Sequence, residues 1–364
     1  MSQQFQAIRE AFSAMRRDAK ARHRDIAEKL GISEGTLIAA HAGIPDESAG
    51  SDTDATLRAT RLRPQWPEIM ESLEPLGEVM ALTRNASCVH EKVGIYRHAS
   101  HNGHVGLVLG GEIDLRVFYT QWAHGFAVNE ATDKGRQQSL QFFDAAGTAI
   151  HKIFLKPQSN AQAYADLVER FGDENQQAEQ VTGATGEVVA EQPDDAIDVA
   201  GFRAAWSGLR DTHDFFSLLK NFGVSRTQGL RLADSRYAQR VDADSVRDIL
   251  DAAAREGVSI MVFVGNPGMI QIHSGVVRKV AVMGPWVNVL DPGFNLHLRE
   301  DHIASAWVVK KPTADGLVTS LEAFDKNGDA IAMFFGERKP GKPELCEWRA
   351  LIEPLLKESA PCAA

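Results

Sequence analysis

The chain repeats itself, and this repeat constrains the fold more than any other feature of the sequence. Residues 139–150 (SLQFFDAAGTAI) align without a gap with residues 320–331 (SLEAFDKNGDAI), 181 residues later. The same offset pairs residues 113–118 with residues 294–299. These segments are rich in Val, Ile, Leu and Phe, and Asp-Lys-Asn-Gly-Asp has the composition of a hairpin turn. We therefore expect each half of the chain to end in an antiparallel sheet.

The repeat continues upstream into a pair of short helices. Residues 24–37 (RDIAEKLGISEGTL) resemble a helix-turn-helix, with Gly31 at the corner and Ser33 placed to cap the next helix. Residues 215–233 follow the same pattern, with Ser225 in the place of Ser33. Because a DNA-binding element has no need to recur in two helix-then-sheet halves, the repeat favours packing over DNA contact.

These patterns predict an α+β fold built as a tandem repeat. Each half has helices followed by a multi-stranded antiparallel β-sheet, and we expect a ligand cleft between the halves. Residues 173–195 are polar, acidic and poor in aromatic side chains, as in a linker. We place the N-terminal repeat at 1–172, the linker at 173–198 and the C-terminal repeat at 199–364.

Composition narrows the class of protein. The formal net charge of −10 argues against a chain whose main task is to neutralise phosphates. No window has the roughly 18 uninterrupted apolar residues of a membrane span. The N-terminal segment carries Glu10 and Asp18 and predicts a helix, not a signal peptide. Cys88, Cys346 and Cys362 lie far apart without CxxC spacing, which fits reduced thiols in a cytoplasm.

Residues 209–222 depart most from their counterpart in the first half. A helix here is expected to bury one stripe of side chains: Phe215, Leu218, Leu219 and Phe222. His213 lies one turn before Phe216, at the margin of that stripe, and its counterpart in the first half is Ala21. An imidazole beside large hydrophobes suits the iron of a porphyrin. The alternative is a partly buried structural histidine.

Three separated segments carry a family resemblance: residues 104–128, 211–232 and 309–344. They include "HVGLVLGGEIDLRVFYTQWAHGFAV", "DTHDFFSLLKNFGVSRTQGLRL" and "VKKPTADGLVTSLEAFDKNGDAIAMFFGERKPGKPE". Together with the tandem repeat, they resemble the HemS/HmuS/ChuS-type family of cytoplasmic heme-utilisation proteins of Gram-negative bacteria. The resemblance covers nearly the whole chain.

The resemblance implies roles for two residues at the iron. His213 would be the proximal ligand, and Arg116 of "EIDLR" would face the iron from the distal side. An arginine stays protonated, so it suits a displaceable hydrogen-bond donor at that position. The repeat aligns Arg116 with His297, so the two halves differ there. A solvated strand arginine is the alternative.

The resemblance also implies contacts for the two heme propionates. They would fall on Arg226, Lys311 and Arg338, although each could instead be an ordinary surface charge. Glu337 and Arg338 form an insertion relative to the first half. Family members can carry a tyrosine shortly before this arginine, and this chain has none there.

The expected function is a cytoplasmic carrier of heme b, which accepts imported heme, with an inner-membrane importer as donor, and delivers it to a heme oxygenase. One alternative is a heme-degrading enzyme that uses an external reductant with oxygen or peroxide, in which Arg116 would be catalytic. A second alternative is a DNA-binding regulator that acts through residues 24–40. We expect no membrane insertion and a monomer or homodimer.

Two other patterns in the sequence are weaker indications of a metal site. His98, His101 and His104 are interrupted by an Asn-Gly turn that would point the rings apart, which does not favour zinc. The segment from Asp325 resembles the start of a calcium loop, but Gly336 stands where a bidentate glutamate belongs.

Overall fold

The computed structural model describes residues 2–19, 21–44, 57–132, 135–179, 181, 183, 191–338 and 341–358. The chain forms two compact units. Unit 1 comprises residues 1–84, 91–186 and 266–271, and unit 2 comprises residues 85–90, 187–265 and 272–364.

The secondary structure confirms a tandem α+β fold with antiparallel sheets. The elements of the first copy are α1 (Ser2–Ala19), α2 (His23–Lys29), α3 (Glu34–Ala39), β1 (Leu57–Arg61), α4 (Trp66–Glu71), β2 (Val79–Arg84), β3 (Cys88–Gly94), β4 (Ala99–Asn102), β5 (Val105–Leu109), β6 (Asp114–Phe118), β7 (His124–Thr132), β8 (Gly135–Phe143), β9 (Ala149–Leu155) and α5 (Ala161–Phe171). Short 3-10 turns lie at Glu74–Leu76 and Tyr119–Gln121.

The second copy repeats this order. Its elements are α6 (Val199–Ser207), α7 (Asp214–Phe222), α8 (Arg226–Leu232), β10 (Ala238–Val241), α9 (Ser245–Glu256), β11 (Ser259–Asn266), β12 (Met269–Val276), β13 (Val280–Met283), β14 (Trp286–Asp291), β15 (Phe294–Arg299), β16 (Ser305–Thr313), β17 (Gly316–Phe324), β18 (Ala330–Gly336) and α10 (Cys346–Glu358), with 3-10 turns at Asp194–Ala196 and Glu300–His302. Strands β7, β8 and β9 recur 181 residues later as β16, β17 and β18.

The strands form two nine-stranded sheets that exchange a part of each copy. One sheet has the order β1-β7-β8-β9-β2-β3-β15-β14-β13, and the other has the order β10-β16-β17-β18-β11-β12-β6-β5-β4. Each sheet therefore takes six strands from one copy and the last three from the other. The sequence predicted a sheet at the end of each half but not this exchange, because both copies present equivalent strand edges.

The hairpins of the two copies are built alike. β8 joins β9, and β17 joins β18, through turns in which Asp144 and Asp325 donate a backbone hydrogen bond to the carbonyl four residues on, at 3.0 Å in both cases. Gly147 and Gly328 take φ values of 80° and 83°, a conformation that favours glycine. The hairpin that the repeat predicted at these positions is confirmed.

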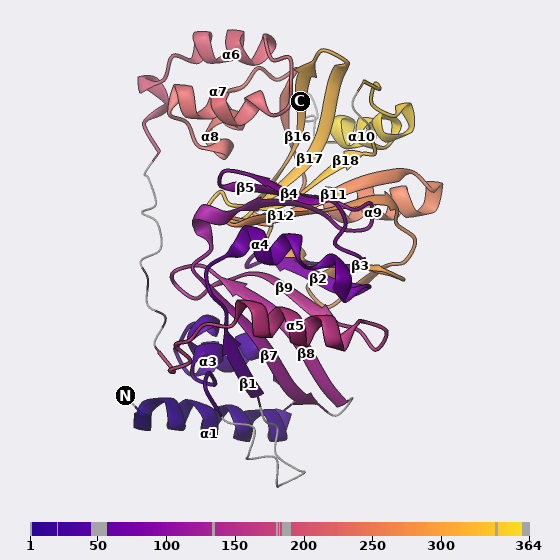
Figure 1. The fold of residues 1–364 in the computed structure, drawn as a ribbon. Helices are drawn as coiled ribbons and strands as arrows, with labels where there is room; N and C mark the ends of the chain where they lie inside the picture. Colours follow the sequence, from indigo (N-terminus) through magenta and orange to yellow (C-terminus); the bar gives the residue numbers. More distant parts are fainter. Residues whose placement is uncertain are drawn as a thin grey trace. The chain divides into compact units, whose positions relative to one another are not determined.

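Helices cover both faces of each sheet near its first strands, because neighbouring residues of β7 and of β16 belong to two different apolar cores, each with its own helices. In unit 1, Tyr164 of α5 packs on β7 and β8, and its hydroxyl donates to the carbonyls of Val128 and Ser139 at 3.4 and 3.2 Å. In unit 2, α6, α7 and α8 gather beside β16 (Figure 1), where the indole Nε1 of Trp206 donates to the Lys310 carbonyl at 3.0 Å. These three helices carry the candidate site.

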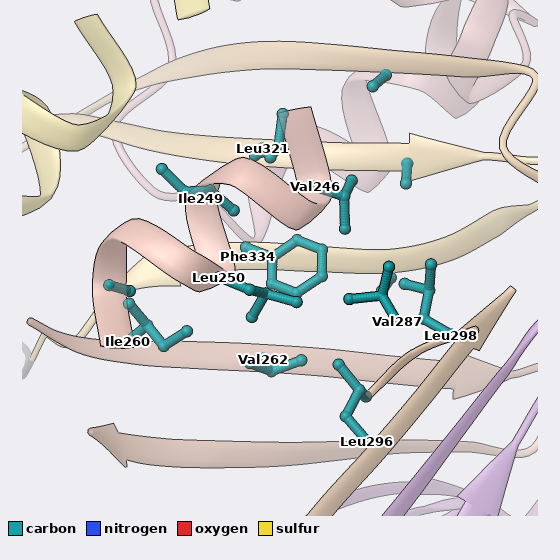
Figure 2. Packing of buried hydrophobic residues seen from close by; sticks show 14 of the residues in the cluster. Val246, Ile249, Leu250, Ile260, Val262, Val287, Leu296, Leu298, Leu321 and Phe334 are labelled. Atoms are coloured by element: carbon teal, nitrogen blue, oxygen red, sulfur yellow. The ribbon is translucent and has the colours of Figure 1, made fainter. Parts of the chain in front are cut away.

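The largest apolar core of unit 2 lies under α9. Figure 2 shows the α9 side chains Val246, Ile249 and Leu250 directed toward strands β11, β14, β15 and β18. Their partners include Ile260, Val262, Val287, Leu296, Leu298 and Phe334, all essentially buried. Helix α9 buries Ala253 in the same core.

The predicted linker lies partly outside the described residues, at 180, 182 and 184–190. Of its described part, Gln176 and Val181 bind within unit 1: Gln176 Oε1 accepts from the Arg61 backbone N–H at 2.8 Å, and the Val181 carbonyl accepts from the Thr36 hydroxyl at 3.1 Å. Asp194 binds Arg231 within unit 2.

Two of the three cysteines can be placed. Cys88 is buried and Cys346 is exposed, and both are free thiols. Cys362 lies outside the described residues. Among the described residues, no helix is long and apolar enough to span a bilayer.

Candidate functional site

The helical corner that resembled a DNA-binding element is packed inside unit 1. Helix α3, which would have to enter the major groove, has every residue buried. Ser33 caps it by accepting from the Thr36 backbone N–H at 3.1 Å, as the sequence predicted. A recognition helix needs an exposed face for base contacts, so α3 cannot serve as one in this conformation. The DNA-binding alternative through this helix is set aside on that ground.

His213 stands at the N-terminal end of α7 with its ring in solvent. Its side chain is 89% exposed. His213 is the residue directly before the helix, and it lies on the exposed side of α7 together with Phe216, which is 74% exposed. The sequence placed His213 at the margin of the buried stripe, but the structure turns it away from that stripe. Phe215, Leu218 and Leu219 are buried as predicted, and Phe222 is half-buried.

Asp211 fixes the orientation of this imidazole. Its Oδ1 accepts both the backbone N–H of His213, at 2.9 Å, and the ring Nδ1–H, at 2.6 Å. The backbone contact and the ring contact hold the pKa of Asp211 below its ordinary value. Because an ionised carboxylate only accepts hydrogen bonds, the proton of a neutral His213 ring belongs on Nδ1. The Nε2 lone pair is then the ligand that the ring presents.

Arg226 and Lys311, two predicted propionate contacts, meet at one buried carboxylate. Arg226 is the first residue of α8, directly after its cap Ser225. Its Nε and Nη2 donate to Glu322 Oε2 and Oε1 at 2.8 and 2.9 Å. Lys311 Nζ, on β16, donates to Glu322 Oε1 at 2.9 Å. The Glu322 side chain is 0% exposed, Lys311 5% and Arg226 27%.

The ring of Phe215 joins this cluster to the helix that follows His213. The Arg226 guanidinium lies 5.1 Å from the ring centroid, and the Lys311 ammonium lies 4.6 Å from it. Both contacts are within the range of a cation–π interaction. Phe215 is itself fixed by an edge-to-face contact with Trp206, with centroids 4.7 Å apart.

The charges of the cluster are strongly coupled. Burial raises the cost of ionising Glu322, but Arg226 and Lys311 outweigh it and hold its pKa well below the ordinary value. Burial lowers the pKa of Lys311 to about 8 although Glu322 opposes this, and Arg226 adds repulsion. At neutral pH the cluster holds two cations and one anion.

The third predicted propionate contact lies apart from this cluster. Arg338 Nη2 is 3.7 Å from Asp315 Oδ2, and the Arg338 side chain is 19% exposed. Its charge also contributes to the lowered pKa of Asp211. Arg338 is therefore within electrostatic range of the Asp211–His213 pair, while Arg226 and Lys311 share Glu322.

Arg116 belongs to unit 1 and is described there by itself. It lies on β6, where its guanidinium pairs with Asp114 and donates to the Leu115 carbonyl at 3.1 Å. The side chain is 33% exposed. Of the His98–His104 run, His101 Nδ1 lies 2.7 Å from Glu71 Oε1, a surface contact with α4.

Sequence reasoning missed two residues of the site, Asp211 and Glu322. Glu322 had a signal in the repeat, and Asp211 had one in the local sequence. Glu322 aligns with Gln141, and Lys311 aligns with Glu130, so the strand positions around the cluster change charge between the copies. Asp211 stands two residues before the histidine, at the spacing of an Asx turn.

Comparison with known proteins decides the family. The haemin-degrading HemS.ChuX domain matches residues 32–171 and 223–355, once in each copy. The chain belongs to the HemS/ChuX family. The resemblance inferred from the sequence is therefore confirmed.

Similar proteins of this family span the whole chain. The hemin transport protein HmuS of Yersinia pestis is 38% identical over 348 residues, which cover 93% of this chain and 96% of that protein. Among solved structures, holo-PhuS, a heme-binding protein from Pseudomonas aeruginosa, is 44% identical with a TM-score of 0.90, covering 96% of this chain and 99% of its own. The heme degrading enzyme ChuS of Escherichia coli O157:H7 is 35% identical with a TM-score of 0.86, covering 97% and 99%.

Proposed function

We propose that the chain binds heme b through unit 2, with His213 as the axial iron ligand and with Arg226 and Lys311 as contacts for a propionate. The observation that carries this proposal is the combination within one unit of an exposed imidazole with a free Nε2 and a paired cation cluster, joined through Phe215. A heme needs a nitrogen ligand, apolar contact for its ring and countercharges for its carboxylates. Phe216 supplies exposed apolar surface beside the ligand.

The donor set fits this group. Asp211 holds the ring in the tautomer that a metal-bound histidine requires, as carboxylate partners of such histidines generally do. Bound heme supplies a Lewis-acidic, redox-active iron. The residues of this chain orient the imidazole, supply positive charge and, through Arg338, add a further cation within range of Asp211. Arg116 is proposed as a hydrogen-bond donor toward the same ligand.

The favoured role is carriage: a cytoplasmic protein that accepts heme after import and passes it to a heme oxygenase. Relatives bear names of both kinds, since HmuS is named for hemin transport and ChuS as a heme-degrading enzyme. The enzyme alternative therefore stands beside the carrier, with Arg116 as its catalytic donor.

A reductant assay separates the two roles. The purified protein loaded with hemin is mixed with ascorbate in air, and the Soret band is followed with catalase present to remove free peroxide. A carrier keeps the band until apo heme oxygenase is added. Loss of the band without an acceptor, dependent on Arg116, would establish the enzyme instead.

Replacing Asp211 with asparagine should lower hemin affinity by roughly tenfold, the lower end of the cost of changing a residue that hydrogen-bonds to a metal ligand. The amide keeps the shape of the turn but removes the charge that strengthens Nδ1–H donation. Resonance Raman of the ferrous complex should show a lower iron–histidine stretching frequency. Glu71→Gln, which changes the carboxylate paired with His101 on the surface of unit 1, is the matched control. An Asp211→Asn complex with an unchanged stretch would refute the orienting role.

A further inference from the structure

Glu322 is a buried carboxylate that already binds both cations proposed to contact a heme propionate. We propose that Glu322 is an internal counter-ion of Arg226 and Lys311, which competes with a heme propionate for these cations and limits the cluster to one further carboxylate. The inference rests on the proposed function, because it concerns how the same cluster takes a heme propionate. The group recognised is a carboxylate carried on an apolar ring.

The hydrogen bonds show how completely Glu322 is held. Its Oε1 accepts from Arg226 Nη2, from Lys311 Nζ and from the Ser320 hydroxyl, the last at 2.8 Å. Its Oε2 accepts from Arg226 Nε. One edge of the guanidinium is thus fully used. Within the part of the chain that the structure describes, Arg226 Nη1 has no hydrogen-bond partner in the cluster, and the side chain keeps its 27% exposure.

The charges leave room for one anion. Two cations face one carboxylate, so the cluster carries a net positive charge of one in a region where Lys311 is nearly inaccessible to water. A second carboxylate would neutralise that excess at the exposed edge of Arg226. Removing Glu322 would leave the buried Lys311 beside the partly exposed Arg226 with no anion between them, which destabilises the free protein but strengthens the attraction for an incoming carboxylate.

Unit 1 holds a cluster of the same composition with the charges rearranged. Glu34, the first residue of α3, pairs with Lys152 of β9 and Arg84 of β2. Its position in the corner corresponds to that of Arg226, because both follow the capping serine. The first copy has Ala21 where the second has His213. Glu34→Gln is therefore a control that removes a buried carboxylate from the cluster of unit 1 and leaves the Arg226–Lys311 cluster unchanged.

The test compares hemin with hemin dimethyl ester, whose carboxylates are blocked, at pH 6.5, where Lys311 remains protonated. Glu322→Gln should lower the melting temperature yet raise hemin affinity by roughly tenfold, equivalent to about 1.4 kcal/mol, with no change for the ester. Glu34→Gln should lower the melting temperature without changing the affinity for either ligand. Glu322→Asp, which keeps the charge on a shorter side chain, should fall between wild type and Glu322→Gln and serves if the glutamine variant does not fold.

The outcomes are distinguishable. Equal or weaker hemin binding by Glu322→Gln, or the same change with the ester, would overturn the assignment of Glu322. Failure of the unsubstituted protein to bind hemin saturably would instead overturn the proposed function. A gain in affinity that Glu34→Gln reproduces would trace the effect to general loosening and would also overturn the proposal.

Discussion

Replacing His213 with alanine is expected to lower hemin affinity by more than about 100-fold, since loss of an outer-shell partner alone costs a metal site roughly 10- to 100-fold. The imidazole is exposed, anchored by Asp211 and not needed for packing, so its loss should leave the fold intact. The Soret band of any residual complex should shift, because the axial nitrogen is gone. A visible-absorption titration and a circular-dichroism spectrum measure both effects.

The matched control is His101→Ala. His101 is also a partly exposed histidine whose Nδ1 contacts a carboxylate, that of Glu71, but it lies on the surface of unit 1. This variant should bind hemin like the unsubstituted protein. If His213→Ala kept the original Soret position and affinity, the axial assignment would be wrong, whatever the behaviour of the control.

Lowering the pH should begin to destabilise unit 1 well above the pH range in which carboxylates titrate, because unit 1 buries neutral histidines. His151 is fully enclosed: its Nδ1 lies 2.8 Å from the Thr83 hydroxyl and its Nε2 lies 2.6 Å from the Tyr96 hydroxyl. Thr83 donates its own proton to Gln271, so the network assigns a proton to Nδ1 and leaves Nε2 accepting from Tyr96. Burial lowers the pKa of His151 to about 3.

The direction of the change in unfolding free energy with pH follows from the difference between the folded and unfolded pKa of His151. An unfolded chain protonates this histidine near its ordinary pKa of about 6.5, whereas the folded chain resists until about 3. The stability is therefore complete above pH 6.5 and is lost progressively as the pH falls. From pH 7 to pH 4, His151 alone should cost roughly 3 kcal/mol of unfolding free energy, since one pKa unit corresponds to about 1.4 kcal/mol.

Denaturant unfolding across this pH range, monitored by hydrogen exchange of the β9 backbone amides, measures this loss of unfolding free energy. His151→Gln removes the titrating group, so its unfolding free energy should fall less steeply below pH 6.5, by about one proton, even though it is less stable at pH 7. An unchanged slope in His151→Gln would mean that another group drives the acid sensitivity.

Much of the fold could be predicted from the sequence because the repeat is a strong constraint. Matching residues 139–150 to residues 320–331 across one offset placed the β8–β9 and β17–β18 hairpins, and the glycine corner placed α7 and α8. The α+β class and the antiparallel sheets followed from these elements. The exchange of β4–β6 with β13–β15 could not be predicted, because it depends on which of two equivalent edges a strand meets, and local pattern is the same for both.

The candidate site was predictable only residue by residue. The sequence singled out His213, Arg226, Lys311, Arg338 and Arg116, but not what each would contact. Arg226 and Lys311 converge on Glu322 because β16 pairs with β17 and α8 packs beside them. Such convergence depends on side-chain geometry across three elements. The repeat did contain the clue, since Gln141 replaces Glu322 in the first copy.

A crystal structure of the hemin complex tests the central claim most directly. We expect iron bound to Nε2 of His213, with Asp211 still hydrogen-bonded to Nδ1 and one propionate on the exposed edge of Arg226. Iron bound to another side chain, or both propionates in solvent away from Arg226 and Lys311, would contradict it.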